Sequence, residues 1–429
     1  MHYYSTNNRN HHATLKEAVI RGQAPDKGLY MPERIPTLPD TFYHNLRGLP
    51  FDEIAFKVAW ALFRDDMELG DVRHIVEDSL NFPIPLVKVE PGMYSLELFH
   101  GPTLAFKDVG ARFMARLLGH FLKNEDREVT VLVATSGDTG SAVAHGFLGV
   151  PGIKVVILYP SGKVSPLQEK QLTTLGQNIT ALEVDGSFDD CQALVKQAFA
   201  DTELNARINL TSANSINIAR LIPQSFYYHY AWSQVPKGED DKVVVCVPSG
   251  NFGNLTAGLI AKRMGLPIHR FVAATNANDV VPQYLKTGLF TPRPSVATLS
   301  NAMDVGHPSN FARMMDLYGN SQEALAKDVV PYTITDADTN ATIQDVLQRT
   351  GYLLDPHGAV SCLALKQYLQ QEPATGIFLE TAHPAKFIEV VEAATAQPVT
   401  VPEALESLRN KTKLAHKISA QLEDLKQYL

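Results

Sequence analysis

A lysine between an aromatic residue and a carboxylate is the first place in this chain where residue types suggest covalent chemistry. Lys107 lies between Phe106 and Asp108, shortly after the turn Gly101-Pro102, and a helical pattern follows it. Apolar neighbours lower the pKa of an ammonium group by destabilising its charged form, and the free amine attacks aldehydes such as pyridoxal phosphate. Lys107 is therefore a candidate Schiff-base lysine, although a lysine at a helix start is more often a solvated surface residue.

Two loops rich in glycine and hydroxyl residues follow apolar runs and open helical patterns. Thr135–Ser141 follows Val129–Ala134, and Pro248–Thr256 follows Lys242–Val247. Backbone N–H groups at the start of a helix point in one direction, so such a loop can form a pocket for a carboxylate or a phosphate. The hydroxyl residues of the first loop could instead only cap a helix, but their density favours a binding loop.

The second loop has the composition of a phosphate-binding loop. Gly250 and Gly253 let the backbone approach a tetrahedral anion, and the side chains of Ser249 and Asn254 can donate hydrogen bonds. The loop matches neither G-x-x-x-x-G-K-S/T nor a complete G-x-G-x-x-G, so neither ATP nor NAD is the expected ligand.

Other polar residues lie after an apolar run or at a helix start. Thr381 follows Ile377–Glu380 and could contact a ligand or only cap the next helix, and the sequence favours neither interpretation. Lys386 is similarly ambiguous. Asn217 and Arg220 lie three residues apart and hence on one helical face, and a guanidinium is a natural partner for phosphate.

The overall composition excludes several classes of protein. The chain has 429 residues, of which 45% are hydrophobic and 20% charged, and this is typical of a globular protein with two or three domains. A net charge of −8 argues against a nucleic-acid-binding protein. There is no apolar run of membrane-spanning length, and the polar N-terminus lacks the apolar core of a secretory signal, so we expect a cytoplasmic protein without a membrane partner.

Neither a disulfide framework nor a metal site is expected. The cysteines are isolated, at positions Cys191, Cys246 and Cys362, and no C-x-x-C pair occurs. No His, Cys and Asp cluster has the spacing of metal ligands, and for His307 and His357 a plain turn role is the favoured interpretation.

The pattern along the chain predicts an α/β fold. Residues 1–90 read as a helical N-terminal section, with apolar positions at helical spacing in Phe51–Phe63. Beyond them, short continuous apolar runs alternate with helical patterns, which is typical of βα units on parallel sheets covered on both faces. The predicted strands are Val129–Ala134, Lys154–Tyr159, Ile179–Val184, Lys242–Val247 and Ile377–Glu380, with His269–Ala274 as a plausible sixth. Ligands of such sheets bind at the carboxyl ends of the strands.

Taken together and in this order, the motifs resemble the fold type II pyridoxal-phosphate enzymes, the group of tryptophan synthase β, cysteine synthase and the serine and threonine dehydratases. Within the group, the chain is most similar to the longer threonine synthases of bacteria and fungi. The match extends over nearly the whole chain and is carried by Leu98–Asp108, Ala134–Gly140, Ser249–Asn254, Asn301–Asp304 and Gly376–Phe387.

The resemblance implies an organisation in four parts. We expect the helical N-terminal section over 1–90, a large cofactor-binding α/β domain over 91–130 and 216–400, a smaller α/β domain over 131–215, and a helical C-terminal tail over 401–429. It also implies a small-molecule substrate, no nucleic-acid partner, and a monomer or homodimer.

The implied reaction converts O-phospho-L-homoserine and water to L-threonine and phosphate by γ-elimination and β-addition of water, the last step of threonine biosynthesis. Lys107 would hold pyridoxal 5′-phosphate and then move protons at Cα and Cβ. The implied cofactor contacts are Phe106, Asp138, Ser249, Gly250, Asn251, Phe252, Gly253, Asn254 and Thr381. The substrate carboxylate would contact Ser136, Gly137 and Thr139, and the substrate phosphate Asn217 and Arg220, with Lys163 and Lys386 as helpers.

Two positions depart from the wider group. Asp138 stands where the group usually has an asparagine that contacts the cofactor, and Val109 stands where it commonly has an arginine. Both departures are those of the longer threonine synthases, and the role of Asp138 stays open. The competing hypotheses are a dehydratase that performs simple β-elimination, a catalytically silent protein that retains the scaffold and, more distantly, a metal hydrolase.

Overall fold

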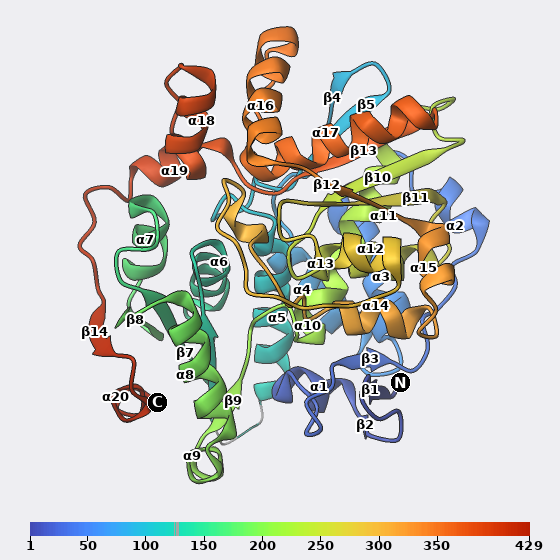
Figure 1. The fold of residues 1–429 in the computed structure, drawn as a ribbon. Coiled ribbons are helices and arrows are strands. Elements are labelled where there is room, and N and C mark those ends of the chain that lie inside the picture. Colours follow the sequence, from blue (N-terminus) through green and yellow to red (C-terminus); the bar gives the residue numbers. More distant parts are fainter. Residues whose placement is uncertain (124, 126–127) are drawn as a thin grey trace.

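Two of the three sheets formed by the described residues are built mainly from parallel strands. The structure is a computed structural model that describes residues 1–123, 125 and 128–429 (Figure 1). The larger of the two sheets has six strands, of which only the edge strand β4 is antiparallel to its neighbour. Their spatial order is β12 (Val329–Thr333), β11 (Ile268–Thr275), β10 (Val243–Pro248), β13 (Thr375–Glu380), β5 (Met93–Glu97) and β4 (Leu86–Glu90).

The second sheet has five strands, and all its pairs are parallel. The order is β14 (His416–Ser419), β8 (Ile179–Asp185), β7 (Ile153–Pro160), β6 (Val129–Ala134) and β9 (Asn209–Thr211). All six residues of β6 are buried, as are those of β10 and β13. Strands covered on both faces need apolar residues at every position, which is why the six predicted strands are confirmed with ends that shift by two residues at most.

Helices surround these sheets. The N-terminal section contains α1 (Leu15–Arg21), α2 (Asp40–His44), α3 (Phe51–Phe63) and α4 (Leu69–Ser79). The smaller sheet carries α6 (Asp138–Phe147), α7 (Pro166–Thr173), α8 (Phe188–Ala200) and α9 (Thr202–Arg207). The remaining helices are α5 (Lys107–Leu122), α10 (Ile218–Leu221), η1 (Ile222–Ser225), α11 (Phe226–Gln234), α12 (Gly253–Arg263), α13 (Val280–Thr287), η2 (Asn301–Met303), α14 (Phe311–Leu317), α15 (Gln322–Asp328), α16 (Asp336–Thr350), α17 (Pro356–Gln371), η3 (Pro384–Phe387), α18 (Ile388–Thr395), α19 (Glu403–Glu406) and α20 (Leu422–Lys426).

The N-terminal section is helical, as predicted, but it also contains a small sheet. Its strands β2 (His12–Ala13), β1 (Tyr3–Ser5) and β3 (Tyr30–Pro32) pair antiparallel. The α1 helix begins with a capping box in which Thr14 and Glu17 each bond the other's backbone N–H. Strands of two or three residues leave no periodic pattern in a sequence, so the helical signal of the neighbouring segments hid them.

The C-terminal segment corrects the expectation of a purely helical tail. After α18 the chain crosses from the large sheet to the smaller one, as the red trace in Figure 1 shows, and adds β14 parallel to β8. Lys413 fixes the crossing by bonding Glu169 at 2.6 Å and Glu183 at 2.7 Å. Only one residue of β14 is buried, so the strand forms through backbone bonds to a neighbour that the local sequence does not reveal.

One continuous apolar core connects the parts. It includes buried residues of α3 and α4, of α5, of β6 and β7 in the smaller sheet, and of β10 and β11 in the large one. In Figure 1, α5 runs between the smaller sheet with its helices and the helices beside the large sheet. Lys107 is the first residue of α5 and therefore lies where both sheets meet. The boundaries expected for the four parts stay a prediction, although β4, from the range 1–90, pairs within the large sheet.

No helix in the described ranges combines the length and the hydropathy that crossing a lipid bilayer requires.

The core contains a histidine whose burial makes stability depend on pH. His229 is fully buried, its ring stacks on Tyr43 with centroids 5.8 Å apart, and neither ring nitrogen bonds to a described residue. Burial lowers the pKa of His229 to about 3. Unfolding therefore takes up a proton below about pH 6.5. Because of this uptake, the free energy of unfolding falls by about 1.4 kcal/mol per pH unit as the pH falls towards 4.

We expect His229→Phe to remove this proton uptake. The free energy of unfolding of the variant, relative to wild type, should rise as the pH falls from 7 to 5, measured by urea unfolding at several pH values. His74→Gln, which changes an exposed histidine on α4, should show the wild-type slope. Equal slopes for His229→Phe and wild type would contradict the prediction.

Candidate functional site

Backbone hydrogen bonds hold the segment before Lys107 against the segment after β13. The Phe106 N–H donates to the Thr381 carbonyl at 2.8 Å, and the His383 N–H donates to the Leu104 carbonyl at 3.0 Å. Leu104 has a φ of 58°, in the left-handed region, which costs a residue with a side chain about 1 kcal/mol or more. The paired segments place Thr381 next to the start of α5. Lys107 and Thr381, which are far apart in the sequence, therefore share one site.

The amine of Lys107 lies in a cluster of charged groups. The side chain is partly accessible, yet protein atoms surround the amine closely enough that desolvation lowers its pKa. The carboxylate of Asp138 opposes this shift, and the cations Lys386 and Arg220 strengthen it. Within the described residues, the Lys107 amine forms no hydrogen bond or ion pair, and it lies 5.9 Å from the centroid of the Phe106 ring. A free amine with a lowered pKa is the state that attacks an aldehyde.

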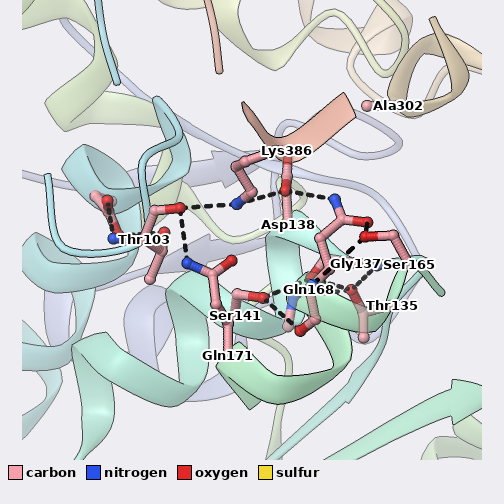
Figure 2. Close-up of polar contacts among 12 residues, drawn as sticks. Thr103, Thr135, Gly137, Asp138, Ser141, Ser165, Gln168, Gln171, Ala302 and Lys386 are labelled. Atoms are coloured by element: carbon pink, nitrogen blue, oxygen red, sulfur yellow. Dashed lines mark hydrogen bonds and ion pairs between the residues drawn. The ribbon is translucent and has the colours of Figure 1, made fainter. Parts of the chain in front are cut away.

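A buried ion pair joins three segments next to this amine (Figure 2). The Lys386 ammonium, with a side chain 0% exposed, lies 2.7 Å from Asp138 Oδ1 and donates to the Thr103 carbonyl at 2.7 Å. Gln168 of α7 donates to the same Asp138 oxygen at 2.8 Å, and Gln171 donates to the Thr103 carbonyl at 3.1 Å. Desolvation alone would raise the pKa of Asp138, but Lys386 and Lys107 outweigh it and hold the pKa well below its usual range.

A second buried carboxylate fixes the loop that carries Lys107. Asp108 accepts hydrogen bonds from the Thr103 N–H at 2.9 Å and from the Thr103 hydroxyl at 2.7 Å. Burial raises the pKa of Asp108, and the Thr103 bonds together with Lys386 and Arg112 work against that rise. Thr103 therefore links Asp108 to Lys386, which makes the turn before Lys107 part of the same polar network.

The loop before α6 has the form expected of an anion-binding loop. Thr135 turns inward, and its hydroxyl oxygen accepts the N–H groups of Gly137 at 3.0 Å and Gly140 at 2.8 Å. Gly137 has a φ of 147°, and a side chain there would also meet the Gln168 amide at 2.8 Å. The N–H groups of Ser136, Asp138 and Thr139 have no acceptor among the described residues. They are available to a carboxylate.

The loop before α12 presents a larger set of free donors. Phe252 has a φ of 61°, and no side chain caps the helix. The N–H groups of 250–254 find no acceptor in the part of the chain that the structure describes. The side chains of Ser249 and Asn254, expected to donate to a ligand, bond within the loop instead: Ser249 Oγ donates to Asn254 Oδ1 at 3.2 Å, and Asn254 Nδ2 donates to the Pro248 carbonyl at 2.8 Å.

Gly250 is the point where this loop touches a neighbouring turn. A side chain at Gly250 would come within 2.9 Å of Met303 Cα and 3.0 Å of the Ala302 carbonyl oxygen. Both are backbone atoms, which cannot move aside as the end of a side chain can. The 301–305 turn therefore rests directly on the phosphate-type loop, and only glycine allows this approach.

The remaining predicted residues differ in how far the structure brings them to Lys107. The hydroxyl of Thr381 bonds to no described residue and is free to meet a ligand. Arg220 is buried, its Nη1 donates to the Ala213 carbonyl, and its Nε has no described partner. Burial lowers the pKa of Arg220 to about 10, against the opposing effect of Asp108, so it stays charged at neutral pH.

Two residues predicted for the substrate phosphate are placed less favourably. The Asn217 amide donates to the carbonyls of Val19 at 3.0 Å and Ser212 at 3.1 Å, and its oxygen accepts the Ala219 N–H. Both its donors are therefore committed to the backbone. Lys163 is exposed in the turn after β7 and contacts none of the charged residues around Lys107.

The polar residues that support the site carry no recognisable signal in the sequence. Thr103, Gln168 and Gln171 bond the ion pair or its loop, and none of them lies in a glycine-rich motif. His357, interpreted as a turn residue, is buried at the start of α17, and so is Asp355. In the described residues, no group of three His, Cys, Asp or Glu side chains could hold a metal ion.

Comparisons with known proteins give similarity over the full length. Three family models match: "Threonine synthase N terminus" over residues 2–80, "Pyridoxal-phosphate dependent enzyme" over 83–379, and "Threonine synthase, C-terminal" over 358–429. Threonine synthase of Haemophilus influenzae is 49% identical over 429 residues, which cover 100% of this chain and 99% of the relative.

Two solved structures have the same architecture. The crystal structure of threonine synthase from Escherichia coli matches with a TM-score of 0.93 and 44% identity, covering 100% of this chain and 99% of that one. The structure of pyridoxal-phosphate-bound threonine synthase from Brucella melitensis matches with a TM-score of 0.93 and 34% identity, covering 100% and 98%. The expected α/β fold of the type II enzymes is thereby confirmed.

The buried ion pair gives a testable energetic prediction. We expect Lys386→Met to destabilise the apoprotein by about 3–5 kcal/mol, because it leaves the Asp138 carboxylate buried without its cation. The double variant Lys386→Met with Asp138→Asn should recover much of this loss, since an amide carries no charge. Urea unfolding measures both.

The control is an exposed ion pair of similar chemistry. Arg34 lies 3.0 Å from Asp65, with side chains 65% and 42% exposed, so Arg34→Met should cost less than about 1 kcal/mol. A cost of Lys386→Met no larger than that of Arg34→Met would mean that the buried pair does not hold the segments together.

Proposed function

The chain belongs to the threonine synthase family of pyridoxal-phosphate-dependent enzymes, and we propose that Lys107 and the loops around it carry out the family's reaction on O-phospho-L-homoserine. In this reaction, γ-elimination of phosphate and β-addition of water yield L-threonine, which is the last step of threonine biosynthesis. The observation that carries the proposal is the free amine of Lys107 near Asp138 at the start of α6, together with the unpaired N–H groups at the starts of α6 and α12.

The residues present fit pyridoxal phosphate. The Lys107 amine is free to bind the aldehyde, the N–H groups at the start of α12 are free to bind the phosphate, and the open hydroxyl of Thr381 suits the ring nitrogen. Phe106, Asp138 and the backbone of Asn251 and Phe252 would complete the pocket. When bound, the cofactor supplies an electron sink that stabilises negative charge at Cα and Cβ of the substrate.

The charges around Lys107 suit a substrate with two anionic groups. Two buried cations, Lys386 and Arg220, lie near the Lys107 amine and the carboxylates Asp108 and Asp138, although the whole chain has a net charge of −8. A buried cation in a site of low polarity attracts a phosphate more strongly than a surface lysine does.

Lys107 would act as the proton carrier of the reaction. Once the substrate amine has displaced it, its free amine would take the proton from Cα and later return protons at the substrate carbons. Its lowered pKa keeps the amine unprotonated at a pH where an ordinary lysine is charged. Thr381 would present a hydroxyl to the ring nitrogen, and a hydroxyl does not force this nitrogen to be protonated as an aspartate would. The cofactor would therefore be a weaker electron sink than one whose ring nitrogen faces an aspartate.

We assign the substrate carboxylate to the loop of Ser136, Gly137 and Thr139, where the N–H groups of Ser136, Asp138 and Thr139 are free and that of Gly137 is bonded to Thr135, and the substrate phosphate to Arg220 and Lys386. Arg220 has an unused buried N–H, and Lys386 uses two of its three. Asn217 is left out of the phosphate site because its amide donors are committed, and Lys163 is at most a peripheral contact. The cytoplasmic location, the domain boundaries and a monomeric or homodimeric state stay predictions.

Replacing the lysine tests its covalent role. Lys107→Ala should lower turnover by at least about a thousandfold, because both the anchor and the proton carrier are lost. Borohydride reduction followed by peptide mapping should find a pyridoxyl group on Lys107 of the wild type and none in the variant. Lys196→Ala, on the exposed side of α8, should behave as wild type. Near-normal turnover of Lys107→Ala would refute the assignment.

Substrate preference separates the proposal from a simple β-eliminating dehydratase. The wild type should have a kcat/KM for O-phospho-L-homoserine at least about a hundredfold higher than for L-serine or L-threonine. The reason is that the cationic groups of the site lack an anionic partner when the substrate has no phosphate. Arg220→Gln should lower kcat/KM for the phosphorylated substrate and leave the weak reaction with serine nearly unchanged. Activity on the unphosphorylated amino acids alone would sink the proposal.

A further inference from the structure

The start of α17 contains a buried histidine that the reaction does not use. Asp355 caps the helix: its carboxylate accepts the N–H groups of His357 at 2.8 Å and Gly358 at 3.2 Å. His357 is 2% exposed and Asp355 is 0% exposed. A buried imidazole needs partners for both nitrogens, and these partners show what the residue does.

The two partners of His357 fix its protonation. Its Nε2 accepts the backbone N–H of Ala302 at 3.2 Å, and because an N–H can only donate, Nε2 carries no proton. The proton is then on Nδ1, which lies 2.5 Å from Asp355 Oδ1 and donates to it. His357 is therefore a neutral connector between a helix-capping carboxylate and the 301–305 turn.

Asp355 is itself held in place by a second acid. Its N–H donates to Glu380 Oε1 at 2.6 Å, and Glu380 is the last residue of β13, directly before Thr381. Burial raises the pKa of Glu380 well above its usual range, and the charge of Asp355 adds to this rise. A side chain at Gly358 would overlap a Glu380 oxygen at 1.5 Å, so the start of α17 packs directly on this carboxyl group.

The turn that His357 holds is the one that rests on Gly250. Ala302 and Met303 provide the backbone atoms that approach Gly250 within about 3 Å of where a side chain would begin. On its other side, the His357 ring lies 4.9 Å from the Phe387 ring, next to Lys386. The imidazole thus lies between η3 and the turn and bonds the Ala302 end of the turn, whereas Asp304, at the other end, accepts hydrogen bonds from Thr298, Asn276 and Asn278.

We propose that His357 is a positioning residue for the cofactor-phosphate loop, because its imidazole holds the 301–305 turn against Gly250. The proposal rests on the proposed function, since it takes the N–H groups of 250–254 as the phosphate site. His357 touches neither cofactor nor substrate and acts through the turn. Without its bond, the Ala302 N–H loses its partner, and this end of the turn is held less firmly against the loop that receives the phosphate.

Two substitutions separate the two bonds of the ring. In His357→Asn the shorter amide reaches Asp355 but not Ala302, whereas in His357→Gln the longer amide places an acceptor near the position of Nε2. The probes are pyridoxal phosphate and pyridoxal, titrated into each apoprotein and followed by absorbance. Pyridoxal lacks the phosphate and does not need the Gly250 loop.

We expect His357→Asn to weaken the binding of pyridoxal phosphate about tenfold, in keeping with the loss of one hydrogen bond, and His357→Gln to weaken this binding less than threefold. Pyridoxal affinity should change less than threefold in both. If His357→Asn fails to fold, His357→Phe, which keeps the ring packing on Phe387, provides the same comparison.

Three results would overturn the proposal. The first is an equal loss of pyridoxal phosphate affinity in His357→Asn and His357→Gln, and the second is an unchanged affinity in His357→Asn and His357→Phe. The third is an equal loss of affinity for pyridoxal and for pyridoxal phosphate. The last result would indicate a general structural role. A failure of the proposed function is distinguishable, because the wild type would then take up no pyridoxal phosphate on Lys107.

Discussion

The ion pair between Lys386 and Asp138 is the contact on which the geometry of the site depends. It joins the start of α6 on the smaller sheet to η3 after the last strand of the large sheet, and the Lys386 ammonium also holds the loop before Lys107. Taking two charges out of water costs several kcal/mol each, and their mutual attraction offsets this only when further hydrogen bonds surround them. Gln168 and the Thr103 carbonyl supply those bonds.

This arrangement explains why the site is built from several segments and not from a single motif. A lysine needs a low-polarity surrounding for its pKa to fall, but the same surrounding penalises every other charge nearby. Asp138 pairs with Lys386, and Arg220 adds a second buried cation that packs against Gly110 of α5. The result is a site that keeps buried cations beside an amine of lowered pKa, in a protein that is negative as a whole.

Backbone contacts set the precision of the two anion-binding loops. Each follows a fully buried strand and leads into a helix whose first N–H groups are not capped. Gly137 is required because of its φ and the nearby Gln168, and Gly250 because a turn packs against it. The loops are therefore positioned by neighbours from other parts of the chain, among them the turn that His357 holds.

The sequence by itself determined the elements that have a local signature. The continuous apolar runs identified the strands of both parallel sheets, and the glycine-rich loops and Lys107 were found because each motif is a short run of neighbouring residues. Strands with little apolar content, such as β14, were missed, since their stability comes from the neighbouring strand.

Only the tertiary structure decided which polar groups meet. Asn217 and Arg220 look equivalent in the sequence, yet the amide of Asn217 is consumed by the backbone while Arg220 keeps a free N–H. Lys386 and His357 had no clear role until their partners were known. A hydrogen bond or an ion pair depends on distances between segments far apart in the chain, and those distances are set by the packing of the whole core.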